Sequence, residues 1–156
     1  MWADLVVLGL STALLAFWFR YTCRSILSGR NAHDYAAPVA RSNQLQYPET
    51  HRLLRELSTA GHVDLTRLEV LHRALDRDYR FLTCLIRHGA EFRAASRRFE
   101  NRMLILDFHL MRARYTFWKR ISAERGCAAL EERAHILRHL AEAIGEVSAR
   151  RMAATA

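Results

Sequence analysis

Proline and glycine are scarce in this sequence: its 156 residues include two prolines and six glycines. Because these residues interrupt helices and shape hairpins, their scarcity excludes a collagen-like fibre and a loop-rich fold. Hydrophobic residues form 51% of the chain and charged residues 26%, proportions that exclude an intrinsically disordered chain. The length suits one domain and is too short for two of ordinary size.

Cysteine is also rare. Cys23, Cys84 and Cys127 are far apart and form no C-x-x-C pair, so neither a disulfide framework nor a zinc knuckle is predicted. Lysine occurs once, at Lys119, beside 23 arginines, a ratio that a GC-rich codon pool explains. The formal net charge of +8 still favours contact with anionic surfaces.

Signatures of catalysis are missing as well. The chain has no glycine-rich phosphate loop, no G-x-S-x-G and no H-E-x-x-H. Cys84 lies inside an apolar run, residues 82–86, which is typical of a packed cysteine and not of a nucleophile. We therefore expect a protein that is not an enzyme, with no cofactor and no small-molecule substrate.

One long hydrophobic run is present near the N-terminus. No residue from Leu5 to Phe19 is ionisable, and a transmembrane helix needs about 20 mostly apolar residues. No A-x-A cleavage site follows the run, which favours an uncleaved anchor over a signal peptide. We expect residues 1–27 to form the anchor and its juxtamembrane extension, with these residues at the membrane interfaces: Trp2, Trp18, Arg20, Tyr21 and Arg24.

Basic residues determine the expected orientation. Arg20, Arg24, Arg30 and Arg41 follow the hydrophobic run, and no lysine or arginine precedes it. The positive-inside rule therefore predicts a single-pass protein of the inner (cytoplasmic) membrane. Its N-terminus is expected outside and its C-terminal part in the cytoplasm.

The remainder of the chain is predicted to be all-α, because no stretch alternates as a strand would. Residues 28–47 show no sustained period and are expected to be a linker. From Leu65 onward, apolar residues recur at spacings of three and four, a coiled-coil-like heptad seam in which His72 is the polar member. A lone polar residue at such a position is typical of a register-setting side chain.

The expected cytoplasmic bundle covers residues 48–150. An antiparallel three-helix bundle is predicted from residues 64–88, 91–125 and 127–150, with helix 48–60 packed on it as a possible fourth member. Arg125-Gly126 predicts the end of the second long helix, and residues 151–156 are expected to be a disordered tail. In an alternative, Gly89 makes no break, and one long helix, 64–125, oligomerises.

Two Glu-x-x-His motifs are the sharpest candidates for chemistry: Glu69/His72 and Glu132/His135. Di-iron carboxylate bundles combine two such motifs with one glutamate from each of two further helices. The middle helix offers no carboxylate at the matching level, so the ligand count is too small for two irons. For this reason a di-metal bundle is only an alternative to the leading hypothesis. In that alternative, Glu131 and His139, beside the motifs, could serve as further ligands.

Helix 91–125 is apolar on more than one side. One stripe continues the seam through these residues: Phe99, Met103, Leu106, Leu110, Ala113 and Phe117. A second stripe is the candidate protein interface: Leu104, Phe108, Met111, Tyr115 and Trp118. Burial under helix 48–60 is the alternative explanation of the second stripe.

The same helix is rich in arginine, with one cluster at its start: Arg93, Arg97, Arg98 and Arg102. Such a cluster suits anionic lipid or nucleic acid, although a solvated outer face explains it equally well. Nucleic acid is disfavoured because no recognition motif accompanies the cluster.

The leading hypothesis is an accessory or scaffolding subunit of a membrane complex, whose partner is another membrane protein or a second copy of this chain. An adaptor for anionic lipid or nucleic acid is its first alternative.

Overall fold

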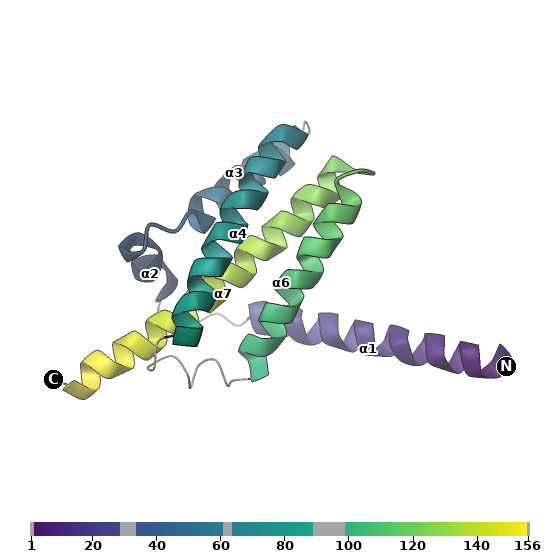
Figure 1. Ribbon diagram of the computed structural model, residues 1–156, viewed down its shortest axis with the longest axis horizontal. Coiled ribbons are helices and arrows are strands. Elements are labelled where there is room, and N and C mark those ends of the chain that lie inside the picture. Colours follow the sequence, from purple (N-terminus) through teal and green to yellow (C-terminus); the bar gives the residue numbers. More distant parts are fainter. Residues whose placement is uncertain (1, 29–33, 61–63, 89–98, 156) are drawn as a thin grey trace. The chain divides into compact units, whose positions relative to one another are not determined.

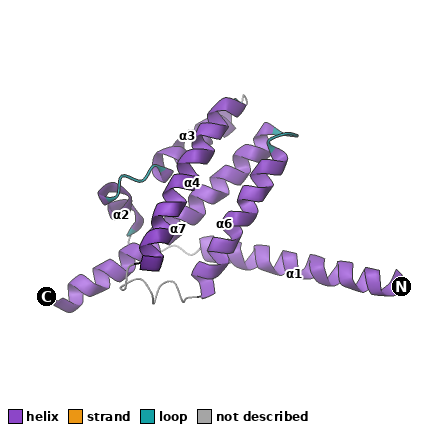
Figure 2. Cartoon of the chain, viewed as in Figure 1, coloured by secondary structure: helices purple, strands orange, loops and turns teal. Residues whose placement is uncertain are grey.

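The computed structural model describes residues 2–28, 34–60, 64–88 and 99–155 (Figure 1). Within these ranges the chain forms six α-helices and no strand (Figure 2), which confirms the all-α prediction. The helices are α1 Trp2–Ser28, α2 Ala36–Ser42, α3 Tyr47–Ala60, α4 Leu65–His88, α6 Phe99–Trp118 and α7 Ala123–Thr155. The chain divides into two compact units: α1 belongs to residues 1–31, and α2 to α7 belong to residues 32–156.

Helix α1 contains the one segment, among the described residues, that is long and apolar enough to cross a membrane. This segment, Asp4–Ser25, has 22 residues and a mean hydropathy of 1.5. Its threonine hydroxyls bond within the helix: Thr12 Oγ1 donates to the Leu8 carbonyl at 2.8 Å and Thr22 Oγ1 to the Trp18 carbonyl at 2.9 Å. These bonds reduce the cost of placing hydroxyl groups in an apolar medium.

Helix α7 organises the second unit, because it packs against α2, α3, α4 and α6 (Figure 1). Its buried residues lie on several sides of the helix: Ala129, Leu130, Ala134, Ile136, Leu137, Leu140, Ala141 and Ile144. A helix that is apolar around most of its circumference belongs at the centre of a bundle. Together α3, α4, α6 and α7 make the four-helix form of the predicted bundle.

Helices α4 and α6 run antiparallel and meet through side chains. Tyr79 stacks on Phe108 with 4.0 Å between ring centroids, and Glu69 lies 3.1 Å from Lys119. Residues early in α4 therefore meet residues late in α6, so residues 64–125 are not one long helix. The α4 seam is buried at four positions, Leu68, Leu75, Leu82 and Ile86.

The boundary between α6 and α7 differs from the prediction. Helix α6 ends at Trp118, and the Ser122 hydroxyl accepts the Arg125 N–H at 3.4 Å, which caps the start of α7. The helix end predicted at Arg125-Gly126 is therefore wrong, because Gly126 lies in the first turn of α7 against Tyr115. The disordered tail predicted from Arg151 is also wrong, since alanine-rich residues extend α7 to Thr155.

The segment expected to be a linker contains a short helix, α2. Asp34 Oδ1 accepts the N–H groups of Ala36 at 3.2 Å and Ala37 at 3.3 Å, so the side chain satisfies donors of the first turn. The start of α2 lies very close to α7 at Gly145, where an added Cβ would stand 2.5 Å from the Tyr35 carbonyl oxygen. Only glycine leaves room for this approach, so Gly145 fixes how α2 docks.

A long-range cap starts α3. The buried side chain of Asp78, on α4, accepts the N–H groups of Gln46 at 2.6 Å and Tyr47 at 2.7 Å through Oδ2. Burial raises the pKa of Asp78, and the two backbone hydrogen bonds counteract that rise. This carboxylate, predicted by no pattern in the sequence, joins α3 to α4.

Candidate functional site

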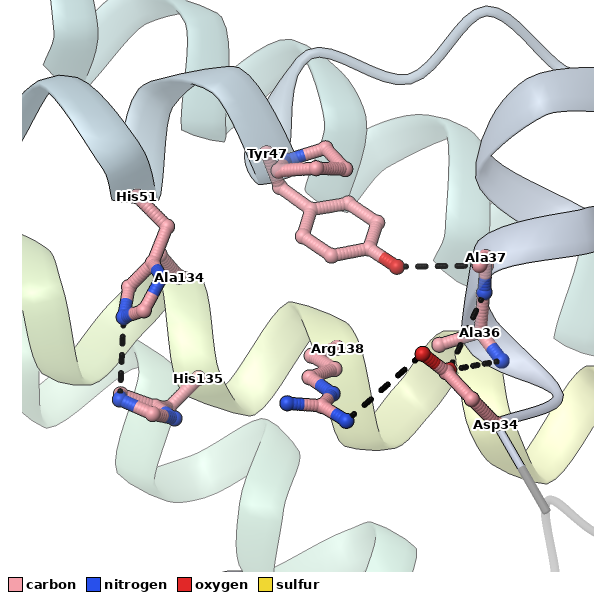
Figure 3. Close-up of a pocket in the computed structure, with 9 residues that line it drawn as sticks. Asp34, Ala36, Ala37, Tyr47, His51, Ala134, His135 and Arg138 are labelled. Carbon is pink, nitrogen blue, oxygen red and sulfur yellow. Dashed lines mark hydrogen bonds and ion pairs between the residues drawn. The ribbon is translucent and has the colours of Figure 1, made fainter.

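Helices α2, α3 and α7, with Asp34, enclose a pocket of about 210 Å³ (Figure 3). Its lining combines apolar and polar groups: Asp34, Ala36, Ala37, Tyr47, Pro48, His51, Ala134, His135 and Arg138. Two histidines lie at one end of the pocket, with Arg138 and Asp34 towards the other. Arg138 reaches the Asp34 carboxylate at 3.9 Å and that of Glu142 at 3.3 Å. The pocket therefore has a histidine end and an ion-pair end.

At the histidine end, three ligand-type side chains converge from two helices. His51 Nε2 on α3 lies 3.1 Å from His135 Nε2 on α7 and 4.0 Å from Glu131 Oε1. Within the described residues, this is the group of three or more His, Cys, Asp or Glu side chains that could share a metal ion, with its ligand atoms within 4.8 Å of one another. All three residues are half-buried. We call them the His51 cluster.

Both histidines of the His51 cluster favour the neutral form. Burial is the main cause that lowers the pKa of each, and the neighbouring Glu131 carboxylate opposes the shift in both. With two neutral imidazoles, one ring N–H donates to the lone pair of the other ring. Without a bound ion, this hydrogen bond joins the two histidines.

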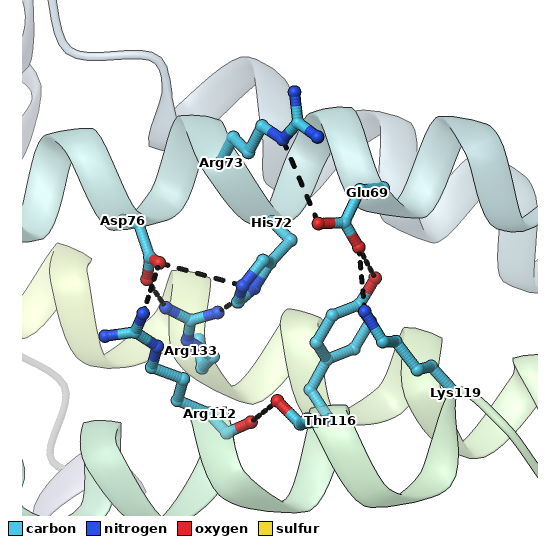
Figure 4. Close-up of polar contacts among 9 residues, drawn as sticks. Glu69, His72, Arg73, Asp76, Arg112, Thr116, Lys119 and Arg133 are labelled. Atoms are coloured by element: carbon cyan, nitrogen blue, oxygen red, sulfur yellow. Dashed lines mark hydrogen bonds and ion pairs between the residues drawn. The ribbon is translucent and has the colours of Figure 1, made fainter.

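A second polar cluster lies where α7 meets α4 and α6 (Figure 4). Arg133 is fully buried, donates to His72 Nδ1 at 2.6 Å and also donates to the Asp76 carboxylate. Its guanidinium lies 4.2 Å from the centre of the Phe108 ring, a cation–π contact. Arg112 reaches the other oxygen of Asp76 at 3.4 Å. We call His72, Asp76 and Arg133 the Arg133 cluster.

Burial and the Arg133 charge together favour the neutral form of the histidine in the Arg133 cluster. Burial lowers the pKa of His72, and the adjacent Arg133 guanidinium lowers it further, whereas Asp76 and Glu69 act in the opposite direction. A neutral Nδ1 accepts the Arg133 donor, which a protonated ring cannot do. His72 is thus a structural acceptor, as predicted for a polar residue in the seam.

Glu69 forms a separate contact one turn before His72. It accepts hydrogen bonds from Lys119 Nζ at 3.1 Å and from the Tyr115 hydroxyl at 3.3 Å. The Lys119 hydrogen bond is the main cause that lowers the pKa of Glu69. Burial, with the Glu69 charge, raises the pKa of Tyr115 to about 12, so Tyr115 stays a donor.

The two Glu-x-x-His motifs do not share a site. Glu69 bonds to Lys119 and Tyr115, His72 bonds to Arg133, and Glu132 faces Arg114 at 3.9 Å. Of the four predicted ligands, His135 alone belongs to the His51 cluster, so the paired-motif site is wrong. Sequence reasoning missed His51 and treated Glu131 only as an accessory ligand. The Glu131-x-x-x-His135 spacing could have indicated this site from the sequence, because it places both side chains on one face of α7.

Over most of α6 the two faces are exchanged relative to the prediction, although Met103, assigned to the core seam, is buried. Four residues of the candidate interface are only 1–3% exposed: Leu104, Phe108, Met111 and Tyr115. They form core, so they are not a docking surface, and Trp118 is half-buried with Arg125 over its ring at 4.3 Å. Three residues assigned to the core seam are exposed instead: Leu106, Leu110 and Phe117. The second stripe is the buried one because its aromatic side chains find ring partners on α4: Phe108 stacks on Tyr79, and Tyr115 stacks on His72.

The remaining predicted site residues belong to the anchor and to the arginine cluster. All five expected interface residues of the anchor lie in α1: Trp2, Trp18, Arg20, Tyr21 and Arg24. Arg102 is exposed on α6. The other three arginines of its cluster lie outside the described residues: Arg93, Arg97 and Arg98.

Comparison with known proteins gives no relative. No protein-family model matches the chain, and neither does any curated protein or solved structure. The functional argument therefore rests on the residues and geometry above.

Proposed function

We propose that this chain is a membrane-anchored, non-catalytic helical protein, an accessory or scaffolding subunit of a membrane complex that acts through protein–protein contacts. The observation that supports this function is an exposed apolar stripe along α6 and into the following turn. It comprises Leu106, Leu110, Ala113, Phe117 and Ile121, and we call it the outer stripe.

The outer stripe has the geometry of a docking surface. Its residues recur at spacings of three and four, so they share one side of the helix. The four large side chains, Leu106, Leu110, Phe117 and Ile121, are 45–63% exposed. Isolated exposed hydrophobic residues are ordinary, but a row along one helix is typical of a surface that a partner covers.

The surroundings of the outer stripe indicate the chemistry of the partner. A shallow hollow beside it is lined by apolar and basic groups: His109, Arg112, Ala113, Thr116, Phe117, Arg120 and Ile121. An amphipathic helix with apolar residues on one face and acidic residues along its edge complements this surface. The proposed occupant is such a helix in another membrane protein.

The α1 helix supplies the location in this proposal. A span of 22 residues suits a single crossing of the bilayer, and Arg20 and Arg24 lie near its C-terminal end. By the positive-inside rule, the bundle lies on the cytoplasmic side of the inner membrane and the N-terminus lies outside. The partner is then a protein with a cytoplasmic segment at the same membrane.

The test is affinity purification of the full-length chain from its native membranes in mild detergent, followed by mass spectrometry. The wild-type chain should retain a partner that resists moderate salt, and Leu110→Ser with Phe117→Ser should lose it. Val70→Ser is the matched control, because Val70 is 64% exposed on α4, outside the outer stripe.

Two results would contradict the proposal. A partner that the double variant still captures would not dock on the outer stripe. Binding that collapses between low and moderate salt would instead indicate an anionic lipid or nucleic acid, since charge-dominated contacts are screened. Recovery of this chain alone, as a larger species that the double variant cannot form, would make the partner a second copy.

A further inference from the structure

We propose that His51, Glu131 and His135 bind a divalent transition-metal ion, with Zn²⁺ as the best chemical match. Two imidazoles and one carboxylate are a ligand set that zinc uses where one coordination position stays open. The set comes from two antiparallel helices, α3 and α7. This site is independent of the outer stripe on α6.

The distances within the His51 cluster are close to those that a zinc ion requires. Bonds of about 2.0–2.1 Å at tetrahedral angles place neighbouring ligand atoms about 3.3–3.4 Å apart. The two Nε2 atoms are 3.1 Å apart, and Glu131 Oε1 is 4.0 Å from His51 Nε2. The nitrogens therefore need to separate slightly, and the carboxylate needs to approach His51 by less than about 1 Å. All three ligand atoms already lie within 4.8 Å of one another.

The ligand types select the class of ion. Imidazole nitrogen is a preferred ligand of zinc and its neighbours in the first transition row, whereas Mg²⁺ and Ca²⁺ prefer sets made of oxygen atoms. No thiolate takes part, because the nearest cysteine along α7, Cys127, directs its Sγ to the Leu54 carbonyl at 3.6 Å. The site therefore favours a borderline divalent ion over a hard cation.

Charges of both signs surround the His51 cluster: Glu131 favours a bound cation, whereas Arg55 and Arg138 act against it. Arg55 Nε lies 3.8 Å from Glu131 Oε1, but the Arg55 side chain is 70% exposed, so this ion pair is largely solvated. One turn further along α7, His139 pairs with Glu142 at 3.3 Å. The Arg138 side chain is 51% exposed, so solvent screens its repulsion as well. The half-buried Glu131 carboxylate, beside the two imidazoles, is then the charge that attracts a cation.

The pocket gives the ion an open coordination position. His51 and His135 line it, and Arg138 lies further along the same cavity (Figure 3). A water molecule in the pocket would complete a four-coordinate zinc.

The test is calorimetric titration of Zn²⁺ into the full-length chain in mild detergent, after treatment with a chelator. The wild-type chain should bind one ion, and Mg²⁺ should produce no comparable binding. His51→Ala, His135→Ala and Glu131→Gln should each weaken binding by at least about 100-fold, since loss of even an outer-shell partner costs 10–100-fold.

His139→Ala is the matched control, because His139 lies one turn beyond His135 on α7 and is half-buried like it. This variant should bind zinc as the wild-type chain does. Glu131→Gln keeps the size and shape of the side chain, so it tests the site even where a histidine variant fails to fold. Zinc should also raise the thermal midpoint of the wild-type chain and of His139→Ala, and leave that of Glu131→Gln unchanged.

The proposal would be overturned if the wild-type chain bound no zinc at micromolar concentrations. Equal weakening by Glu131→Gln and His139→Ala would also overturn it, because binding would then come from scattered surface histidines. Neither result affects the partner-capture test, since the outer stripe lies on a different helix.

Discussion

The two polar clusters on α7 use similar side chains in different ways. Each combines histidine with a carboxylate. Arg133 belongs to one cluster, and Glu131 and His135, each two positions from Arg133 along α7, belong to the other. Because each residue turns the helix by about 100°, the Arg133 side chain leaves α7 on nearly the opposite side from the other two. One cluster faces α4 and α6, whereas the other faces α3.

The difference between the clusters lies in the source of positive charge. In the Arg133 cluster, a fully buried guanidinium neutralises Asp76 and donates to His72, so the protein supplies its own cation. In the His51 cluster, the guanidinium groups that act on the histidines, those of Arg55 and Arg138, belong to exposed side chains, and the histidines bond to each other. A cluster that contains its own buried cation contributes structure, whereas a cluster that lacks one is suited to a cationic ligand. Four variants sharpen this comparison.

The largest effect is expected for Arg133→Met. Removing the buried cation leaves Asp76 and His72 without their central partner, and breaking a buried ion pair costs about 3–5 kcal/mol. Urea unfolding of the full-length chain in detergent, followed by circular dichroism, should show a loss in this range. Arg112→Met is the control: its side chain is 48% exposed, so its ion pair to Asp76 should contribute less than about 1 kcal/mol.

Phe108→Ala should cost about 3 kcal/mol, since the ring is buried between Tyr79 and the Arg133 guanidinium. Phe117→Ala, on the exposed side of the same helix, should change the free energy of unfolding by less than about 0.5 kcal/mol. The same urea titrations provide both values. Similar losses in the two variants would mean that α6 buries both sides.

The Arg133 cluster should also make stability depend on pH. The pKa of His72 is lower in the folded chain than in the unfolded chain, so the unfolded chain takes up the proton first as pH falls. The stability that the neutral His72 contributes is therefore fully present above about pH 6.5, and it is lost as pH falls through the pKa of His72 in the folded chain.

The measurement for this prediction compares thermal midpoints at pH 7.5 and pH 5.5. His72→Gln keeps an oxygen acceptor for Arg133 but does not titrate, so its midpoint should fall less than that of the wild-type chain. The other groups that face His72 are Glu69, Asp76, Arg112, Tyr115 and Arg133, and they are the same in both proteins. Parallel slopes in the two proteins would show that His72 does not titrate there.

The smallest effect is expected for Glu131→Gln without added metal. The Glu131 side chain is 30% exposed, and its contacts to His51 and Arg55 are 4.0 and 3.8 Å long. Such an ion pair contributes less than about 1 kcal/mol, so the urea midpoint should change little. A loss as large as that of Arg133→Met would show that both clusters are structural.

The sequence predicts the long helices well where one periodic stripe dominates. Helix α4 is an example, because its leucines leave one buried face and the boundaries differ from prediction by one residue. Helix α6 carries two apolar stripes, and periodicity alone cannot tell which of them finds ring partners on α4 and the Arg133 guanidinium on α7. The candidate site was harder to predict. His51 and His135 are 84 residues apart, and only the antiparallel packing of α3 on α7 brings their rings together.

The Asp78 cap has a consequence for how the bundle opens. Helix α3 has 14 residues, close to the length below which an isolated helix is marginal in water, and its first amides bond to a carboxylate on α4. The amide protons of Gln46 and Tyr47 should therefore exchange with solvent only when α4 moves away. In a hydrogen-exchange experiment these two amides report the separation of α3 from α4, an opening of the bundle that the thermal and urea midpoints of the whole chain do not resolve.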